Sequence, residues 1–142
     1  MRRNKYNNRK VTIDGIVFDS AREGDYYDHL KQLKRAGIVE RFELQPKFTL
    51  QESFRKRGKL FRAIDYKADF RVWLADGTDF VVDVKGFETP DFKIKRKLFE
   101  KRYKGLELKL VTYSKIDGGW IELDDLKEAR KRRKLEREKG KK

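Results

Sequence analysis

The fold is decided by the stretch Ile64-Asp65-Tyr66-Lys67-Ala68-Asp69-Phe70-Arg71-Val72-Trp73-Leu74 and by the segment that follows it, Phe80-Val81-Val82-Asp83-Val84-Lys85-Gly86. Apolar residues occupy the even positions from 64 to 74, and mostly polar residues occupy the odd ones. This period of two is typical of a strand with one buried face. The second segment alternates in the same way, so Asp83 and Lys85 point away from the core. We therefore predict a β-hairpin with one polar face.

The loop between the two strands decides which residues are paired. A two-residue loop would place Asp83 and Lys85 in the core, whereas the three-residue loop Ala75-Asp76-Gly77, with a left-handed glycine, keeps them on the polar face. The hydrophobic pattern selects the longer loop, and Asp69 then lies directly opposite Asp83. Opposed residues have Cβ atoms roughly 5 Å apart, and like charges at that distance destabilise a sheet. A cation is therefore expected between the two carboxylates.

A divalent metal ion is one candidate for that cation, because Mg²⁺ is held by one or two carboxylates and completes its octahedron with water and phosphate oxygens. Lys85, on the same face, is placed to orient or activate an attacking water and to offset charge on a phosphate. The alternative is a solvated strand face on which Lys85, Lys67 and Arg71 neutralise the two aspartates. The residues alone leave both interpretations open.

A lone aspartate in one strand, followed by Asp-x-Lys in the next, resembles the active-site signature of the PD-(D/E)xK nuclease superfamily. Here Asp69 follows Ala68 rather than the proline of the motif, and Asp83-Val84-Lys85 supplies the second part. With the upstream segment Phe42-Glu43-Leu44-Gln45-Pro46-Lys47-Phe48, the chain is similar, between residues 10 and 115, to a family of small phage-encoded proteins related to Holliday junction resolvases.

The resemblance implies a restriction-endonuclease-like α/β fold, a single domain with a mixed β-sheet flanked by helices. It implies metal ligation by Asp69, Asp83 and the Val84 carbonyl, with Mg²⁺ as the metal and Mn²⁺ as the alternative. Lys85 would be the catalytic lysine and Glu23 an auxiliary acid. The implied activity is metal-dependent hydrolysis of DNA by a metal-activated water. We expect branched DNA, such as a four-way junction, to be the substrate, during phage recombination or packaging. The superfamily includes restriction enzymes, exonucleases and resolvases.

Glu23 also has a purely structural interpretation. The segment Ser20-Ala21-Arg22-Glu23 has the S-x-x-E spacing of a capping box, in which the serine caps the helix and the glutamate reaches back to the serine amide. A helix is predicted to begin here and to run from about Ala21 to Arg35. Glu23 is therefore either a helix cap or an auxiliary acid.

The net charge of +14 is concentrated at the two ends of the chain. The first ten residues carry five basic and no acidic groups, and the last sixteen carry ten basic and three acidic groups. Two further basic clusters fall in a predicted loop and a predicted helix. Such clusters suit a polyanion, most simply nucleic acid through its phosphates. The residues expected to bind it are Arg55, Lys56, Arg57, Lys59, Lys93, Lys95, Lys97, Arg132 and Arg133.

Other partners and compartments are less favoured. The basic charge can instead serve only solubility, and membrane binding is disfavoured because Leu135 is the only residue able to insert after Ala129. The chain has no cysteine, which excludes disulfides and thiolate metal sites and suits a reducing cytoplasm. It has neither an apolar run of about 20 residues nor a signal-peptide core. We therefore expect a cytoplasmic protein, in the bacterial host if it is phage-encoded.

The pattern divides the chain into a basic flexible arm (1–10), a nuclease-like domain (11–122) and a basic C-terminal helix or tail (123–142). The helix between the hairpin and the next strand predicts a crossover that places its lysines beside the carboxylates. The predicted elements are a hairpin at 11–18, a strand at 38–51 that is either bent or placed near a sheet edge because of Pro46, a basic loop at 52–61, a helix from 89 to about 103, a strand at 106–113 and a helix from 123 to about 139.

Two functional hypotheses follow from the sequence. The first is a metal-dependent endonuclease, which would act as a homodimer if its substrate is a four-way junction, because matched nicks are most simply made by two symmetric sites. The alternative is a non-catalytic nucleic-acid-binding accessory protein whose carboxylates are structural.

Overall fold

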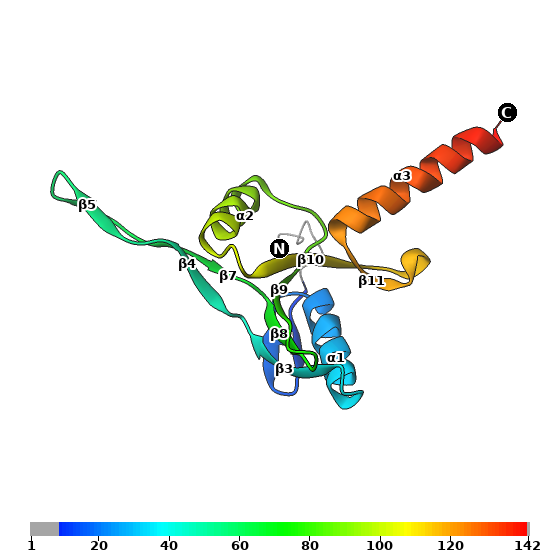
Figure 1. The fold of residues 1–142 in the computed structure, drawn as a ribbon, viewed down its shortest axis with the longest axis horizontal. Helices are drawn as coiled ribbons and strands as arrows, with labels where there is room; N and C mark the ends of the chain where they lie inside the picture. Colours follow the sequence, from blue (N-terminus) through cyan, green and yellow to red (C-terminus); the bar gives the residue numbers. More distant parts are fainter. Residues whose placement is uncertain (1–8, 142) are drawn as a thin grey trace.

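The computed structural model describes residues 9–141 and has a central mixed sheet with helices packed against it (Figure 1). The sheet has five strands in the order β11-β10-β9-β8-β3. The pair β9 and β10 is parallel, and the other neighbours are antiparallel. The prediction of a single mixed α/β domain is confirmed. The strands of this sheet are β3 (Val39–Leu44), β8 (Phe70–Leu74), β9 (Asp79–Val84), β10 (Glu107–Ser114) and β11 (Gly119–Glu122).

Three α-helices follow the predicted pattern closely: α1 (Ala21–Arg35), α2 (Pro90–Arg102) and α3 (Leu123–Gly140). The side chain of Ser20 caps α1, and the side chain of Thr89 caps α2 with a proline at the first position. The helix α2 joins β9 to its parallel neighbour β10, so the predicted crossover is present. The predicted short hairpin is present as β1 (Val11–Ile13) and β2 (Ile16–Phe18), and it packs against α1.

The sheet has a hydrophobic cluster on each face, because its strands are covered by α1 on one side and by α2 on the other. Val82 packs in the α1 cluster with Tyr26 and Leu30, whereas Val81 packs in the α2 cluster. In that second cluster lie Phe92 and Phe99 of α2, together with residues of β4 (Lys47–Gln51) and β7 (Ile64–Lys67). Neither face of the central strand β9 is therefore left to solvent.

Strands β3 and β4, running outward, and β7 and β8, running back, form one long antiparallel ribbon. The ribbon is interrupted at Gln45-Pro46 on the outward side and at Ala68-Asp69 on the returning side. On either side of the interruption β3 pairs with β8 and β4 with β7. At the interruption, the Gln45 amide donates to the Asp69 carbonyl at 2.8 Å, and the Ala68 amide donates to the Pro46 carbonyl at 3.0 Å. Gln45 has a φ of 50°, and the predicted bend at Pro46 is confirmed.

The prediction of one continuous strand from 64 to 74 is therefore wrong. The structure divides it into β7 and β8, and the two parts turn opposite faces to the helices. Tyr66 and Ala68 of the first part pack in the α2 cluster, whereas Phe70 and Val72 of the second pack in the α1 cluster. All four lie at even positions, which one regular strand would keep on one face. The faces exchange because the ribbon bends out of the five-stranded sheet.

The basic segment 52–61, predicted as a loop, is instead a β-hairpin that prolongs the ribbon. Its strands are β5 (Phe54–Lys56) and β6 (Lys59–Phe61), and its turn residues Arg57 and Gly58 have φ values of 53° and 75°. Two consecutive positive φ values are characteristic of the tight turns that match the twist of a hairpin. Figure 1 shows this hairpin as an arm that projects far from the sheet.

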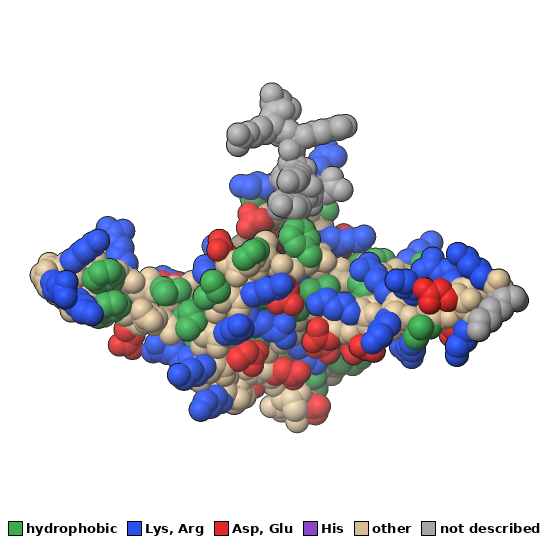
Figure 2. All heavy atoms as spheres, turned by 90° about the horizontal axis from the view of Figure 1, so that it is seen from above, with side chains coloured by type: hydrophobic (Ala, Val, Ile, Leu, Met, Phe, Trp, Pro, Cys, Tyr) green, Lys and Arg blue, Asp and Glu red, His purple; other side chains and the backbone are tan. Residues whose placement is uncertain are grey.

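The helix α3 forms a second projection at the other end of the molecule (Figure 1). Leu123, Leu126 and Ala129 are buried, and the rest of the helix extends away from the body, as its loss of apolar residues predicted. Arg133 forms an ion pair with Asp117, which ties the helix to the turn before β11. Figure 2 shows basic side chains gathered both on the β5–β6 arm and along α3.

The basic arm predicted at 1–10 lies mostly outside the described residues, of which it includes only Arg9 and Lys10, both exposed. Strand β11, which pairs antiparallel with β10, was not predicted. No helix within residues 9–141 has the length and apolar character needed to cross a membrane.

Candidate functional site

Asp69 and Asp83 lie opposite each other at the point where the ribbon leaves the sheet. The observed register pairs Phe70 with Val82, and the Asp69 amide donates to the Val82 carbonyl at 3.2 Å. Gly77 in the connecting loop has a φ of 91°. The predicted register, with its left-handed glycine, is therefore confirmed from Phe70 to Trp73. Asp69 lies just before β8, where its amide already bonds to Val82, and its carboxyl group is within hydrogen-bonding reach of Asp83.

Asp83 is deeply buried, with only 3% of its surface exposed. Its Oδ2 atom accepts a hydrogen bond from the Tyr66 hydroxyl at 2.5 Å and lies 3.4 Å from the Lys85 ammonium. The sequence predicted that Asp83 points away from the core, and the structure instead buries it, which also excludes the alternative of a solvated face at this residue. The face is covered because β7 turns Tyr66 toward it and α2 brings Phe92 against Lys85, 4.4 Å from the ring centre.

Asp69 is held by the adjoining strand. Its Oδ2 atom accepts a hydrogen bond from the Val84 amide at 2.8 Å. Burial, followed by the negative charge of Asp83 and a hydrogen bond with it, raises the pKa of Asp69 to about 9, and Glu23 adds to the same shift. Two carboxyl groups in one desolvated site cannot easily both be ionised. The shift in the pKa of Asp69 therefore favours its protonated form when no metal ion is bound.

Glu23 joins this cluster from the first turn of α1. The Ser20 hydroxyl accepts from the Glu23 amide at 3.1 Å, so the serine half of the predicted capping box is confirmed. The reciprocal hydrogen bond, from the Ser20 amide to the Glu23 carboxylate, is absent among the described residues. The Glu23 carboxylate accepts a backbone hydrogen bond from Asp19, and its pKa is raised first by burial, then by Asp19 and Asp83. Lys85 acts in the opposite direction. The glutamate is thus close enough to the aspartates to share their electrostatic field.

The alternative charge balance on this face is only partly present. Lys85 pairs with Asp83, but Arg71 forms its ion pair with Asp79 at 2.8 Å rather than with either aspartate of the cluster. Lys67 lines the cleft beside Asp83 but forms no ion pair with either aspartate among the described residues. Of the three cations in that alternative, Lys85 alone pairs with an aspartate of the cluster.

The residues present fit a magnesium ion with few protein ligands. In an extended strand the amide and carbonyl of one residue point to the same side, and the Val84 amide points to Asp69. Asp69, Asp83 and the Val84 carbonyl are therefore the groups that would hold the ion. Among the described residues, no group of three or more His, Cys, Asp or Glu side chains is arranged as a metal site. Mg²⁺ characteristically takes one or two carboxylates and fills the remaining positions with water and phosphate.

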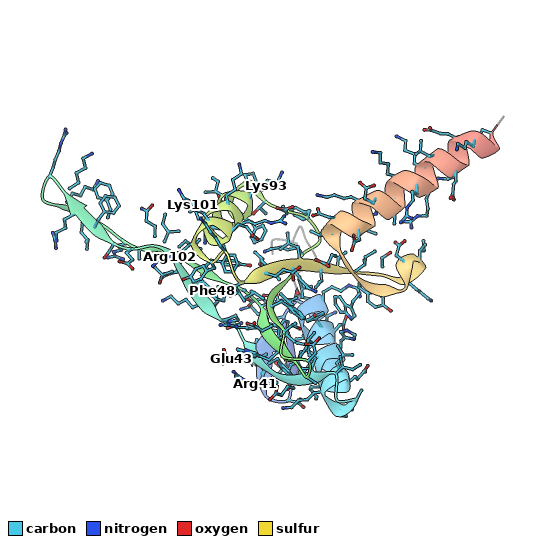
Figure 3. The ribbon with its side chains drawn as sticks, viewed as in Figure 1. Arg41, Glu43, Phe48, Lys93, Lys101 and Arg102 are labelled. Atoms are coloured by element: carbon cyan, nitrogen blue, oxygen red, sulfur yellow. The ribbon has the colours of Figure 1, made fainter. Side chains whose placement is uncertain are left out.

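A cleft of about 540 Å³ opens beside Asp83 and Lys85, between the ribbon and the start of α2. Lys95 is the only residue predicted to bind nucleic acid that lines this cleft. Lys93 and Lys97 are exposed elsewhere on α2, and Figure 3 shows Lys93 on the side of the helix away from the sheet. The lining residues are Lys47, Asp65, Tyr66, Lys67, Asp83, Lys85, Thr89, Asp91, Phe92 and Lys95.

The remaining predicted contacts lie at the two projections. Arg55, Lys56, Arg57 and Lys59 form the end of the β5–β6 arm and are all exposed. Arg132 is exposed on α3, whereas Arg133 is engaged by Asp117. The structure therefore separates the predicted basic residues into a cleft group, an arm group and a helix group.

Two residues of the site were missed. Tyr66 reads as one more apolar position of a strand, and nothing in a period of two shows that its hydroxyl reaches Asp83. Lys47, which lines the cleft and pairs with Asp65 at 3.4 Å, follows Pro46 in a segment read only as bent strand. Its alternation with Phe48 would have placed it on the polar side of that strand, but not beside the carboxylates.

Residues 3–118 match a family described as "Protein of unknown function (DUF1064)". The chain belongs to this family. The DUF1064 region contains Glu23, Asp69, Asp83 and Lys85, and it contains the whole β5–β6 arm, whereas α3 lies beyond it. No curated protein and no solved structure matches the chain.

Proposed function

We propose that this DUF1064 protein is a metal-dependent endodeoxyribonuclease of the PD-(D/E)xK type. The observation that carries the proposal is the close approach of Asp69, just before the start of β8, to Asp83, near the end of β9, with the Lys85 ammonium 3.4 Å from Asp83. Glu23 adds a third acid from α1. This set of groups is suited to holding Mg²⁺, or Mn²⁺ in its place, next to a phosphate.

Each group has a distinct chemical task in this proposal. Bound Mg²⁺ would supply a Lewis acid for the phosphate and a water of lowered pKa. Lys85 offsets the charge that builds on the phosphate. Tyr66 holds the Asp83 carboxylate in one orientation through its hydroxyl. Glu23, whose pKa is raised, is suited to accept a proton from the attacking water.

DNA is the proposed partner, and branched DNA the proposed substrate. Lys47, Lys67 and Lys95 line the same cleft as Asp83 and are placed to hold phosphates near the carboxylates. Selection of branched DNA, as in a Holliday junction resolvase of a phage, comes from the resemblance of the motif. A homodimer is proposed for a four-way junction, and sedimentation of the protein bound to a junction would show two copies.

The function is tested with linear, single-stranded, flapped and four-way-junction DNA, each incubated with Mg²⁺, Mn²⁺ or a chelator. We expect cleavage only with metal, and we expect Asp83→Asn to abolish it while DNA affinity is kept or increased, because a negative charge near the phosphates is removed. Asp65→Asn is the matched control, since Asp65 lines the same cleft outside the cluster. Cleavage by Asp83→Asn at the wild-type rate would exclude this site, and binding without cleavage by the wild type would favour an accessory protein.

A further inference from the structure

The end of the β5–β6 arm carries a stacked pair of aromatic rings that no core requires. Phe54 and Phe61 are paired across the two strands, with ring centres 4.9 Å apart and ring planes at 8°. Their exposed fractions are 44% and 39%. Neither ring belongs to either hydrophobic cluster of the body. Large exposed apolar side chains gathered at one place are typical of an interaction surface.

The charge around these rings indicates the kind of partner. Residues 53–62 contain five basic and no acidic residues. Lys56 and Lys59 are paired with each other two positions from the aromatic pair, and so lie on the same face of the ribbon. The Lys59 ammonium lies 5.4 Å from the centre of the Phe61 ring. Two flat rings flanked by cations match a nucleic acid, in which bases stack on the rings and phosphates meet the cations.

A second copy of the chain is a poorer match for the same surface. Two such tips would bring ten basic groups together with no acid between them, and that repulsion opposes association. An intact duplex is also a poor match, because the faces of its bases are covered by neighbouring bases and are not available to the rings. Aromatic stacking needs a base that is unpaired, at a break in the stack or at a branch.

We propose that Phe54 and Phe61 stack on exposed bases at the branch point of DNA, while Arg55, Lys56, Arg57 and Lys59 hold the adjoining phosphates. This inference rests on the proposed function, to which it adds the chemical feature that separates branched from linear DNA. The arm reaches away from the carboxylates. It would therefore bind the branch while the cleft binds a phosphate in a different part of the same DNA substrate.

The test measures binding rather than cleavage. Full-length protein carrying Asp83→Asn is titrated with a four-way junction that holds 2-aminopurine at the branch, and with a linear duplex of equal length. Phe54→Ala with Phe61→Ala should weaken junction binding by about tenfold or more and remove the change in 2-aminopurine fluorescence, since stacking is worth about 1–3 kcal/mol per base. Binding to the duplex should stay within about twofold, because the cations that bind phosphate remain.

Two further variants separate stacking from support of the arm. Phe54→Tyr with Phe61→Tyr keeps two stacked rings and should retain the preference for junction. Ile94→Ala with Ile116→Ala removes exposed apolar surface elsewhere and should change nothing. Equal weakening on junction and duplex in the alanine variant would overturn the proposal, because the rings would then only stiffen the arm.

Unchanged junction binding would also overturn it, as would a dimer of the free protein that is lost in the alanine variant. The proposed nuclease activity fails separately, since it is judged by the effect of Asp83→Asn on cleavage. The stacking result depends on affinity and fluorescence in a protein that does not need to cut.

Discussion

Asp69 and Asp83 are held in a state that favours a bound cation. Asp83 is buried under α2 with a tyrosine hydroxyl on one oxygen, and Asp69 takes the amide of Val84. Buried carboxylates placed side by side retain a proton unless a cation replaces it. If the proposed Mg²⁺ binds here, it competes with this proton, and stability and metal binding should then both depend on pH.

The first prediction concerns the stability of the metal-free protein. The pKa of Asp69 is raised to about 9, and the usual value of an aspartate in an unfolded chain is about 3.9. Between these values the folded state binds one proton more than the unfolded state, so the free energy of unfolding falls as pH rises. In a chelator, the melting temperature should fall between pH 5 and pH 8. Mg²⁺ should raise it more at pH 8 than at pH 5.

Asp69→Asn is the diagnostic variant for that dependence, because asparagine does not titrate. Its melting temperature should change less with pH than that of the wild type, whereas Asp65→Asn should behave like the wild type. If Asp69→Asn and the wild type lose stability in parallel between pH 5 and pH 8, the carboxyl pair does not hold the proton.

The second prediction assigns Tyr66 a positioning role. Tyr66→Phe removes the hydroxyl that donates to Asp83 and should weaken Mg²⁺ binding and reduce cleavage by at least about tenfold, because a hydrogen bond to a charged group contributes about 1.5–3 kcal/mol. Tyr103→Phe is the control, since its hydroxyl donates to the Thr49 carbonyl in the same cluster. Isothermal titration calorimetry with Mg²⁺ measures the loss of metal affinity in the absence of DNA. Equal effects of the two variants would make Tyr66 merely structural.

The third prediction separates the two interpretations of Glu23. Glutamine serves a helix start nearly as well as glutamate, so Glu23→Gln should change the melting temperature by only a few degrees, a cap being worth about 1 kcal/mol. If Glu23 acts as an auxiliary acid, cleavage should fall by at least about tenfold, since an amide cannot accept the proton. Cleavage at the wild-type rate would leave Glu23 as part of the helix start.

At the scale of elements, the bend between β7 and β8 forms the site. It lets Ala68 and Phe70, two residues apart, enter clusters on opposite faces of the sheet. The same bend brings Tyr66 over the end of β9, and it frees the ribbon to continue outward as the β5–β6 arm. One interruption thus places a hydrogen-bond donor on Asp83 and directs a basic hairpin into solvent.

The fourth prediction concerns the projecting part of α3. Deletion of residues 134–142 removes five basic residues and keeps both the buried first turns and the ion pair of Arg133 with Asp117. Affinity for all DNA shapes should fall by similar factors, and the salt dependence should flatten, because each phosphate contact contributes about −0.9 to the slope on duplex DNA. Preference for branched DNA should persist in the remaining protein. An unchanged salt slope would show that this end serves solubility alone.

At the scale of the whole molecule, the body carries the carboxylates and the two projections carry much of the described positive charge (Figure 2). The match to the DUF1064 family ends at residue 118, before α3 begins at Leu123. The carboxylate cluster and the β5–β6 arm therefore belong to the family region, and the basic helix lies outside it. Loss of the helix should accordingly alter affinity, whereas changes in the arm should alter the choice of DNA.

The sequence by itself determined what depends on neighbours along the chain. The alternation of residues and the length of one turn were enough to place Asp69 opposite Asp83, and capping residues were enough to start α1 and α2, because these features depend on local geometry. Burial of Asp83, its contact with Tyr66 and the approach of Glu23 were decided by the tertiary structure. They depend on the bend at Gln45-Pro46 and on the crossover helix, which packs over a face of polar residues. The pattern of residues within one strand cannot predict which of its faces another element will cover.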